Sequence, residues 1–111
     1  MRKATVFYKG EEAGWLTGND DGSFTFRYSD LWMADSQKPP ISLTLPKIQK
    51  EYRSDHLFPF FFNMLPEGSN KETICRLMRI DGKDLFGLLL AAAGDDAIGA
   101  VTLKAEEGSD D

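Results

Sequence analysis

Alternating apolar and polar positions mark three short segments near the start of the chain, Ala4–Tyr8, Gly14–Thr17 and Ser23–Tyr28. A period of two is typical of a strand with one buried face. The stretches between them, 9–12 and 19–22, contain the glycine, asparagine and aspartate residues that tight turns favour. The pattern predicts a three-stranded antiparallel meander over the first 28 residues.

The most apolar stretch of the chain, His56–Pro66, predicts a central helix with Pro59 in its first turn, where proline is tolerated. Ser54 and Asp55 are candidate N-cap residues, because their side-chain oxygens accept from unpaired backbone N–H groups. Two overlapping sets of apolar residues have helical spacing: Leu57, Phe60, Phe61 and Met64, and Phe58, Phe61, Phe62 and Leu65. A helix that is apolar nearly all round must be buried on several sides. The stretch is far shorter than the ~20 residues that span a membrane, so it is predicted to be core.

Between the meander and this helix the pattern is weaker. Ser29 and Asp30 are expected to cap a short helical turn over residues 31–33. Ile41–Leu45 alternates again and predicts a fourth strand, which Pro46 ends. Residues 47–53 are predicted to form a charged, exposed connection to the central helix.

Beyond the central helix the pattern predicts two further helices and a final strand. The first helix, Lys71–Ile80, is expected to bury a stripe made of Ile74, Leu77 and Met78, with Cys75 beside them. The second, Leu85–Ala93, has Asp84 as its expected N-cap and Gly94 as its C-cap. The strand Ile98–Leu103 is expected to return and pair with the early strands, which ties the chain into one unit.

These elements define an α+β fold, a small bent antiparallel β-sheet or partial barrel packed against about three α-helices. A chain of 111 residues suits one domain and is long enough to build its own core. We expect the domain to cover residues 1–104 and to be followed by an acidic, disordered tail over 105–111.

Charge and cysteine content narrow the class of protein. The net charge is −5, of which residues 104–111 contribute −3. Because an acidic surface repels phosphate backbones, direct nucleic-acid binding is not expected. A single cysteine, Cys75, allows neither an intrachain disulfide nor a multi-cysteine metal site. The first ten residues lack the apolar segment of a signal peptide, so we expect a cytoplasmic protein that does not associate with membranes.

No residue pattern predicts catalysis, a cofactor or a metal. His56 has no serine or cysteine partner arrangement and is expected at the start of the central helix. Cys75 has the spacing of a small buried apolar residue rather than of a nucleophile. Residues 94–100 lack both the GxGxxG spacing and the Lys-Ser/Thr pair of a phosphate loop, and they lack the oxygen ligands of a calcium loop. We therefore expect a binding module and not an enzyme.

Several segments in a fixed order resemble the N-terminal subdomain of the HipA toxin kinases. They are the GWLT strand, Ser23–Tyr28, Ile41–Pro46, Phe60–Gly68, Asp84–Leu89 and Gly94–Val101. Two of them, FFNMLPE and GDDAIGAV, follow the family patterns F-x-N-L-L-P-[DE] and G-x-D-x-x-G-A-V. The resemblance covers about residues 4 to 104 and rests on the order of the motifs, because no single motif is decisive.

One departure from the family shapes the functional expectation. In HipA-like kinases a large kinase body follows this subdomain, whereas this sequence stops in an acidic tail. A free-standing version resembles the HipS antitoxins of HipBST-type toxin–antitoxin systems, whose kinase HipT lacks the subdomain. The resemblance implies an antitoxin that binds and inhibits a HipT-like serine/threonine kinase, with a HipB-like DNA-binding protein as a further member of a ternary complex. The alternative is a scaffold and interaction subdomain excised from an intact HipA-like kinase.

Two stretches are candidates for kinase contact. The loop after the central helix is expected to project toward the kinase cleft, and it consists of Asn63, Met64, Leu65, Pro66, Glu67, Gly68 and Ser69. Met64 and Leu65 would supply the apolar anchor, and the alternative is that these residues only end the helix. A second candidate patch consists of Leu31, Trp32 and Met33, for which a place in the core over the sheet is the alternative.

Overall fold

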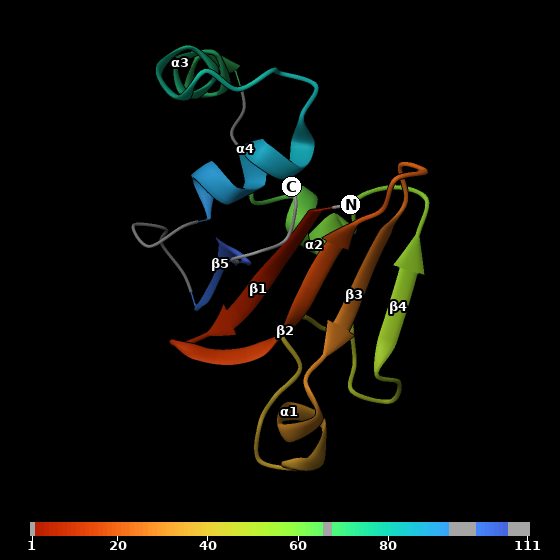
Figure 1. Cartoon of the computed structure of the whole chain (residues 1–111). Coiled ribbons are helices and arrows are strands. Elements are labelled where there is room, and N and C mark those ends of the chain that lie inside the picture. The colour runs from red at the N-terminus through yellow and green to blue at the C-terminus, as the bar shows by residue number, and fades with distance from the viewer. Residues whose placement is uncertain (1, 66–67, 94–99, 107–111) are drawn as a thin grey trace.

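A computed structural model describes residues 2–65, 68–93 and 100–106. Its strands are β1 (Arg2–Tyr8), β2 (Glu11–Gly18), β3 (Phe24–Tyr28), β4 (Glu51–Ser54) and β5 (Val101–Ala105). Its helices are α1 (Asp30–Ala34), α2 (Pro59–Phe62), α3 (Gly68–Met78) and α4 (Leu85–Ala92). The strands form one open antiparallel sheet in the order β4-β3-β2-β1-β5 (Figure 1). The predicted α+β fold is confirmed.

The predicted meander and the returning last strand are both present. β1, β2 and β3 pair in sequence, and a register shift between Val6 and Phe7 interrupts the pairing of β1 with β2. β5 pairs with β1 on its other side, with Val6 opposite Leu103. The pairing continues just past β5, because the backbone N–H of Glu106 donates to the Lys3 carbonyl at 2.9 Å. The last strand therefore lies beside the first, as its apolar pattern predicted.

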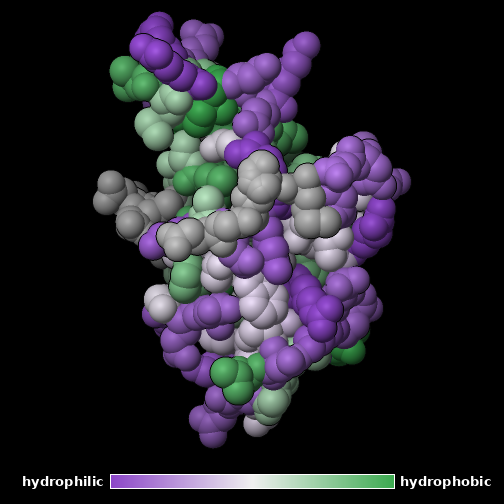
Figure 2. Space-filling view, viewed as in Figure 1, coloured by the Kyte–Doolittle hydropathy of each residue, from purple (hydrophilic) through white to green (hydrophobic). Residues whose placement is uncertain are grey.

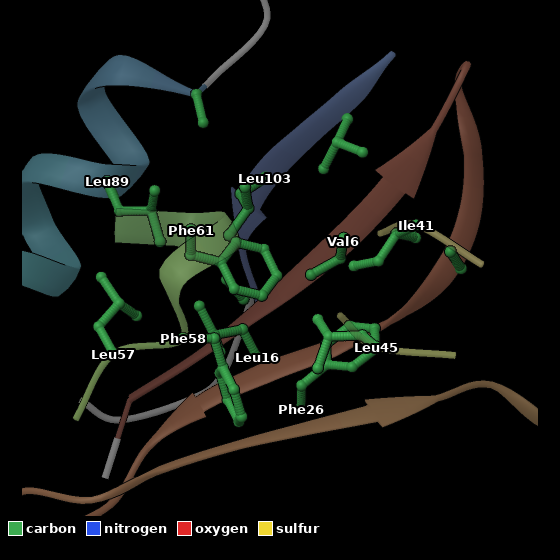
Figure 3. Close-up of a cluster of buried hydrophobic side chains, with 14 of the residues drawn as sticks. Val6, Leu16, Phe26, Ile41, Leu45, Leu57, Phe58, Phe61, Leu89 and Leu103 are labelled. Atoms are coloured by element: carbon green, nitrogen blue, oxygen red, sulfur yellow. The ribbon is translucent and has the colours of Figure 1, made fainter. Parts of the chain in front are cut away.

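One face of the sheet carries the core, and α2 and α4 cover it. The strands contribute Ala4, Val6, Leu16, Phe26, Tyr28, Val101 and Leu103, all of them buried. Phe61 of α2 is fully buried and points into this cluster (Figure 3). Its ring centroid lies 5.9 Å from that of Phe26 and 6.4 Å from that of Phe58. The alternation of the strands thus works as predicted, with the opposite face left largely to charged and threonine side chains.

The central helix is much shorter than predicted. α2 begins at Pro59, and its N-cap is Phe58, whose extended backbone (φ −56°, ψ 137°) makes no side-chain cap. The prediction that Ser54 and Asp55 cap the helix was wrong, since Ser54 belongs to β4. The physical reason is that a residue before proline is pushed out of the helical region, so the helix cannot include Phe58. Phe62 was also predicted to be core, yet 54% of it is exposed.

The predicted strand Ile41–Leu45 is a loop closed around Tyr28. The Tyr28 hydroxyl donates to the Leu45 carbonyl and accepts from the backbone N–H of Ile41 at 3.0 Å. Burial raises the pKa of Tyr28 to about 12. Leu43, expected at the centre of a strand, is 94% exposed. The two polar groups of the loop that a neighbouring strand would have paired are satisfied by one buried side chain instead.

The predicted exposed connection 47–53 was also wrong in part, because its end forms the edge strand β4. Tyr52 lies opposite Phe26 of β3, and its hydroxyl donates to the Pro46 carbonyl at 2.5 Å. Arg27 pairs with Glu51 at 3.7 Å on the other face. Four residues with one half-buried aromatic are enough for an edge strand, which needs only one neighbour.

α3 differs most from its prediction. It buries no residue, and the stripe expected to be core leaves Leu77 73% exposed and Met78 60% exposed. Ile74 and Cys75 are half-buried. α4 agrees better, because Asp84 is its N-cap as predicted and four of its residues are buried. The predicted C-cap Gly94 and the predicted strand residues 98–99 lie outside the described residues.

Candidate functional site

The loop predicted to contact a kinase leaves α2 through a tight turn. The backbone N–H of Asn63 donates to the Pro59 carbonyl at 2.9 Å, and that of Leu65 donates to the Phe62 carbonyl at 3.0 Å. Asn63 is exposed, whereas Met64 and Leu65 are half-buried against the core. Pro66 and Glu67 lie outside the described residues, and the exposed Gly68 and Ser69 begin α3. The described part of this loop is therefore anchored from below and polar at its tip.

A hollow of about 360 Å³ lies between this loop, the start of α3 and α4. Its lining residues are Phe62, Asn63, Leu65, Gly68, Lys71, Leu85 and Leu88. Gly68 has φ +58°, a left-handed conformation that glycine adopts without strain. The hollow combines an apolar floor with one amide and one ammonium group, so it can receive an apolar side chain that carries a polar end.

A second hollow, of about 500 Å³, lies on the other side of Phe62. Phe62 and Leu85 line both hollows, while Arg2, His56 and Phe86 line only the second. Phe62 therefore stands between two depressions with half of its surface exposed. Sequence reasoning missed this residue as a site because its helical spacing indicated a buried stripe. An exposed aromatic flanked by hollows is a frequent anchor in protein interfaces.

Within the second hollow, Asp84 joins the start of α4 to β1. Its carboxylate accepts two bonds from Arg2 Nη1, at 2.7 and 2.9 Å, and one from the backbone N–H of Gly87 at 3.0 Å. The Arg2 guanidinium also lies 5.1 Å from the centre of the Phe86 ring. Burial pushes the pKa of Asp84 up, but the bond from Gly87 and the charge of Arg2 outweigh it and hold the pKa below its usual value. Sequence spacing gave no sign of this pair, which joins residues 82 positions apart.

We expect Asp84→Ala to lower the free energy of unfolding by about 1–2 kcal/mol, because it removes an N-cap and the partner of Arg2. Asp84→Asn should lose less, since its amide oxygen can still accept from Gly87. The folded-state pKa of Asp84 is lowered, so its charge stabilises the fold above the unfolded-state pKa and ceases to do so as the pH falls through the folded-state value. The stability difference between wild type and Asp84→Asn in urea titrations should therefore shrink below about pH 4. Equal losses for the two variants at pH 7 would contradict a capping role.

The second candidate patch is divided by the structure. Trp32 is buried, and its indole Nε1 donates to the Pro39 carbonyl at 2.8 Å. Its ring lies 5.7 Å from that of Tyr8, and the Lys38 ammonium lies 5.1 Å from its centre. Met33 is half-buried against the core, and Leu31 is 86% exposed. α1 lies at the opposite end of the sheet from α3 (Figure 1), so the two candidate patches do not form one surface.

The remaining candidate residues fall as follows. His56 is exposed before α2, and Cys75 is half-buried on α3 near Gly82. Residues 94–99 of the glycine-rich segment lie outside the described residues. In the described ranges, no three His, Cys, Asp or Glu side chains are grouped so that they could hold a metal ion. The same ranges contain no helix with the length and apolarity needed to cross a membrane.

The molecule is thus a small α+β domain with its hollows gathered around α2 and α4. A model of the HipA N-terminal domain family matches residues 4–104. A solved structure described as the N-terminal domain of HipA toxin has a TM-score of 0.72 and 34% sequence identity, over 97% of this chain and 95% of that one. This chain belongs to the HipA N-terminal domain family, as its motifs indicated.

The relatives of this chain have two different lengths. An uncharacterized protein of Haemophilus influenzae is 37% identical over 107 residues, which are 96% of this chain and 95% of that protein. Two proteins of Sinorhizobium fredii named "Putative kinase Y4mE" and "Putative kinase Y4dM" are 31% and 32% identical. They match 96% and 99% of this chain, but the matched part is only 25% and 29% of their own length. The same domain therefore occurs nearly alone in one relative and within a longer chain in others.

Proposed function

We propose that this chain is an antitoxin-like interaction protein that binds a HipT-type serine/threonine kinase and inhibits it. The observation that carries the proposal is the two lengths of the relatives. The domain makes up 95% of the Haemophilus influenzae protein and about a quarter of Y4mE, whose name describes a kinase. A domain that occurs both with and without a longer chain is suited to bind such a chain from outside. A HipB-like DNA-binding protein would complete a ternary complex.

Phe62 and the loop Asn63–Ser69 form the surface that we assign to kinase contact. Phe62 and Asn63 are exposed, and Leu65 lines the hollow beside them. The turn beneath them is fixed by two backbone hydrogen bonds and by Phe61 in the core. A surface held in this way gives up little conformational entropy when it docks, so a small contact can still bind well. This arrangement supports a steric mode of inhibition, in which the loop occupies the kinase cleft.

The proposal is tested by adding the purified chain to a HipT-type kinase from the same organism and measuring autophosphorylation with radiolabelled ATP. We expect inhibition that saturates at a ratio of one to one, and co-expression should relieve the growth arrest caused by the kinase. The chain incubated alone with ATP serves as the control. A kinase that keeps full activity at a tenfold excess of the chain would refute the proposal.

We expect Phe62→Ala and Leu65→Ala each to weaken kinase binding at least tenfold, which corresponds to about 1.4 kcal/mol. Glu67→Ala should weaken it less, since it removes a polar contact. Leu43→Ala is the matched control, because Leu43 is 94% exposed and belongs to a different part of the surface. Titration calorimetry measures the affinity, and a thermal melt of each variant checks the fold. Wild-type affinity in the Phe62 and Leu65 variants would move the contact surface elsewhere.

A second function is favoured by Y4mE and Y4dM, in which the matching region is part of a longer chain. In that setting the domain would be an N-terminal scaffold and interaction unit of one HipA-like kinase. The native protein distinguishes the two. An antibody raised against this domain should detect a product of about 12 kDa in cell extract if the chain acts as a separate antitoxin, whose sequence has a mass of 12.4 kDa. A product about four times larger would support the intact kinase.

A further inference from the structure

The segment around α3 carries positive charge that the rest of the fold does not compensate. Four Lys and Arg residues lie between positions 71 and 83: Lys71, Arg76, Arg79 and Lys83. Among the described residues these four form no ion pair, whereas six cations elsewhere do. The segment contains only two carboxylates, Glu72 and Asp81, so it is net positive in a chain of net charge −5. A basic segment of this kind on an acidic protein favours an acidic partner.

The end of α3 adds exposed apolar surface to this charge. Arg76, Leu77, Met78 and Arg79 are consecutive and all exposed, and they are termed the Arg76–Arg79 patch. Leu77 is 73% and Met78 60% accessible. α3 lies beyond α4 and away from the sheet, and hydrophobic side chains stand beside strongly hydrophilic ones at this end of the molecule (Figures 1 and 2). A helix of 11 residues is marginal in water without packing, so covering this end would stabilise it.

We propose that the Arg76–Arg79 patch is a second docking surface, which binds an acidic and partly apolar surface of the kinase. The inference rests on the proposed function and extends it. The patch lies at the far end of α3 from the loop Asn63–Ser69, about 15 Å along the helix axis. The partner surface should present carboxylates on both sides of a shallow apolar depression that receives Leu77 and Met78. Guanidinium groups bind carboxylates in a bidentate manner, and arginine and methionine are both enriched in protein interfaces.

Other occupants fit the patch less well. A nucleic acid would meet a chain of net charge −5 and would leave Leu77 and Met78 without apolar contact. A second copy of this chain could offer carboxylates, so self-association is included in the test. A kinase surface can provide charge and apolar contact together, and in Y4mE the same domain is joined to three times its own length of further chain.

The full-length chain is titrated against the inactivated HipT-type kinase of the same organism by calorimetry, at 50 and 300 mM NaCl. We expect R76E/R79E to weaken binding at least thirtyfold at 50 mM, and L77S/M78S at least tenfold. The matched control is K9E/K104E, which makes the same change in charge at two exposed lysines away from α3. It should bind within threefold of wild type. Raising the salt should weaken wild type more than R76E/R79E, because the wild type loses screened ion pairs.

A photocrosslinking amino acid at position 77 tests the contact without relying on the affinity of a variant. It should crosslink to the kinase, while the same group at position 43, another exposed leucine, should not. If wild type binds and both patch variants bind equally well, the second docking surface is refuted and the proposed function stands. If wild type does not bind the kinase at all, both fall. A wild-type dimer in sedimentation that R76E/R79E converts to monomer would assign the patch to a second copy and overturn the kinase assignment.

Discussion

Phe61→Ala is expected to lower the free energy of unfolding by about 3–5 kcal/mol, a large share of the stability of a small domain. Phe61 is fully buried, and its ring meets those of Phe26, Phe58 and Phe60 at centroid distances of 5.9, 6.4 and 5.2 Å. Removing it takes away the part of α2 that fills the centre of the core, and the surrounding strands cannot move in to close the cavity. Urea unfolding followed by tryptophan fluorescence measures the loss.

Its neighbour Phe62 provides a matched control with the opposite behaviour. The chemical change in Phe62→Ala is the same, but 54% of this side chain is exposed, so we expect a loss of less than about 1 kcal/mol. In kinase binding the order is reversed, because Phe62 belongs to the proposed contact surface. Similar losses of stability in the two variants would show that α2 is buried on both sides, as its sequence pattern alone suggested.

Gly14→Ala is expected to cost about 3 kcal/mol, because β2 and β3 approach too closely for any side chain at this position. A Cβ atom on Gly14 would lie 2.2 Å from the Arg27 carbonyl oxygen and 2.9 Å from the Tyr28 Cα. Both are backbone atoms of the paired strand, so the sheet itself would have to separate. The separation would also disturb the bond from the Ser29 N–H to the Ala13 carbonyl, 2.8 Å long, which leads into α1.

Gly82→Ala is the control for this substitution. There a Cβ atom would meet only the Lys71 Cε at 3.8 Å and the Cys75 Sγ at 4.0 Å, which are ordinary contacts. We expect a change within about 0.5 kcal/mol, measured by the same urea unfolding. A loss at Gly82 as large as that at Gly14 would mean that the cost comes from replacing glycine in general and not from the close approach of two strands.

The parts of the fold that could be predicted are those in which local pattern and tertiary packing agree. β1, β3 and β5 alternate in the sequence and bury the expected face, for example Val6, Phe26 and Leu103. Ser29 and Asp84 cap α1 and α4 as predicted, because a side chain that caps a helix acts within three residues of its own position. These interactions are local, so one sequence suffices to find them.

The errors arise where a distant contact overrides the local pattern. Ile41–Leu45 alternates as a strand should, but the buried hydroxyl of Tyr28 satisfies the loop, and no sequence rule links these positions. α3 has helical spacing, but the sheet is already covered by α2 and α4, so its apolar residues remain outside. The proposed site suffered in the same way, because Phe62 belongs to an apolar run and its exposure depends on where α2 starts.

β1 is the first strand of the chain, yet it lies inside the sheet between β2 and β5. A nascent chain can form the β1–β3 meander early, but one edge of β1 stays unpaired until Val101–Ala105 has left the ribosome. Contacts between residues so far apart in sequence form slowly, and an unpaired strand edge can associate with other chains. Synthesis of this protein should therefore pass through a stage that depends on chaperones, and the stage ends only when the last strand arrives.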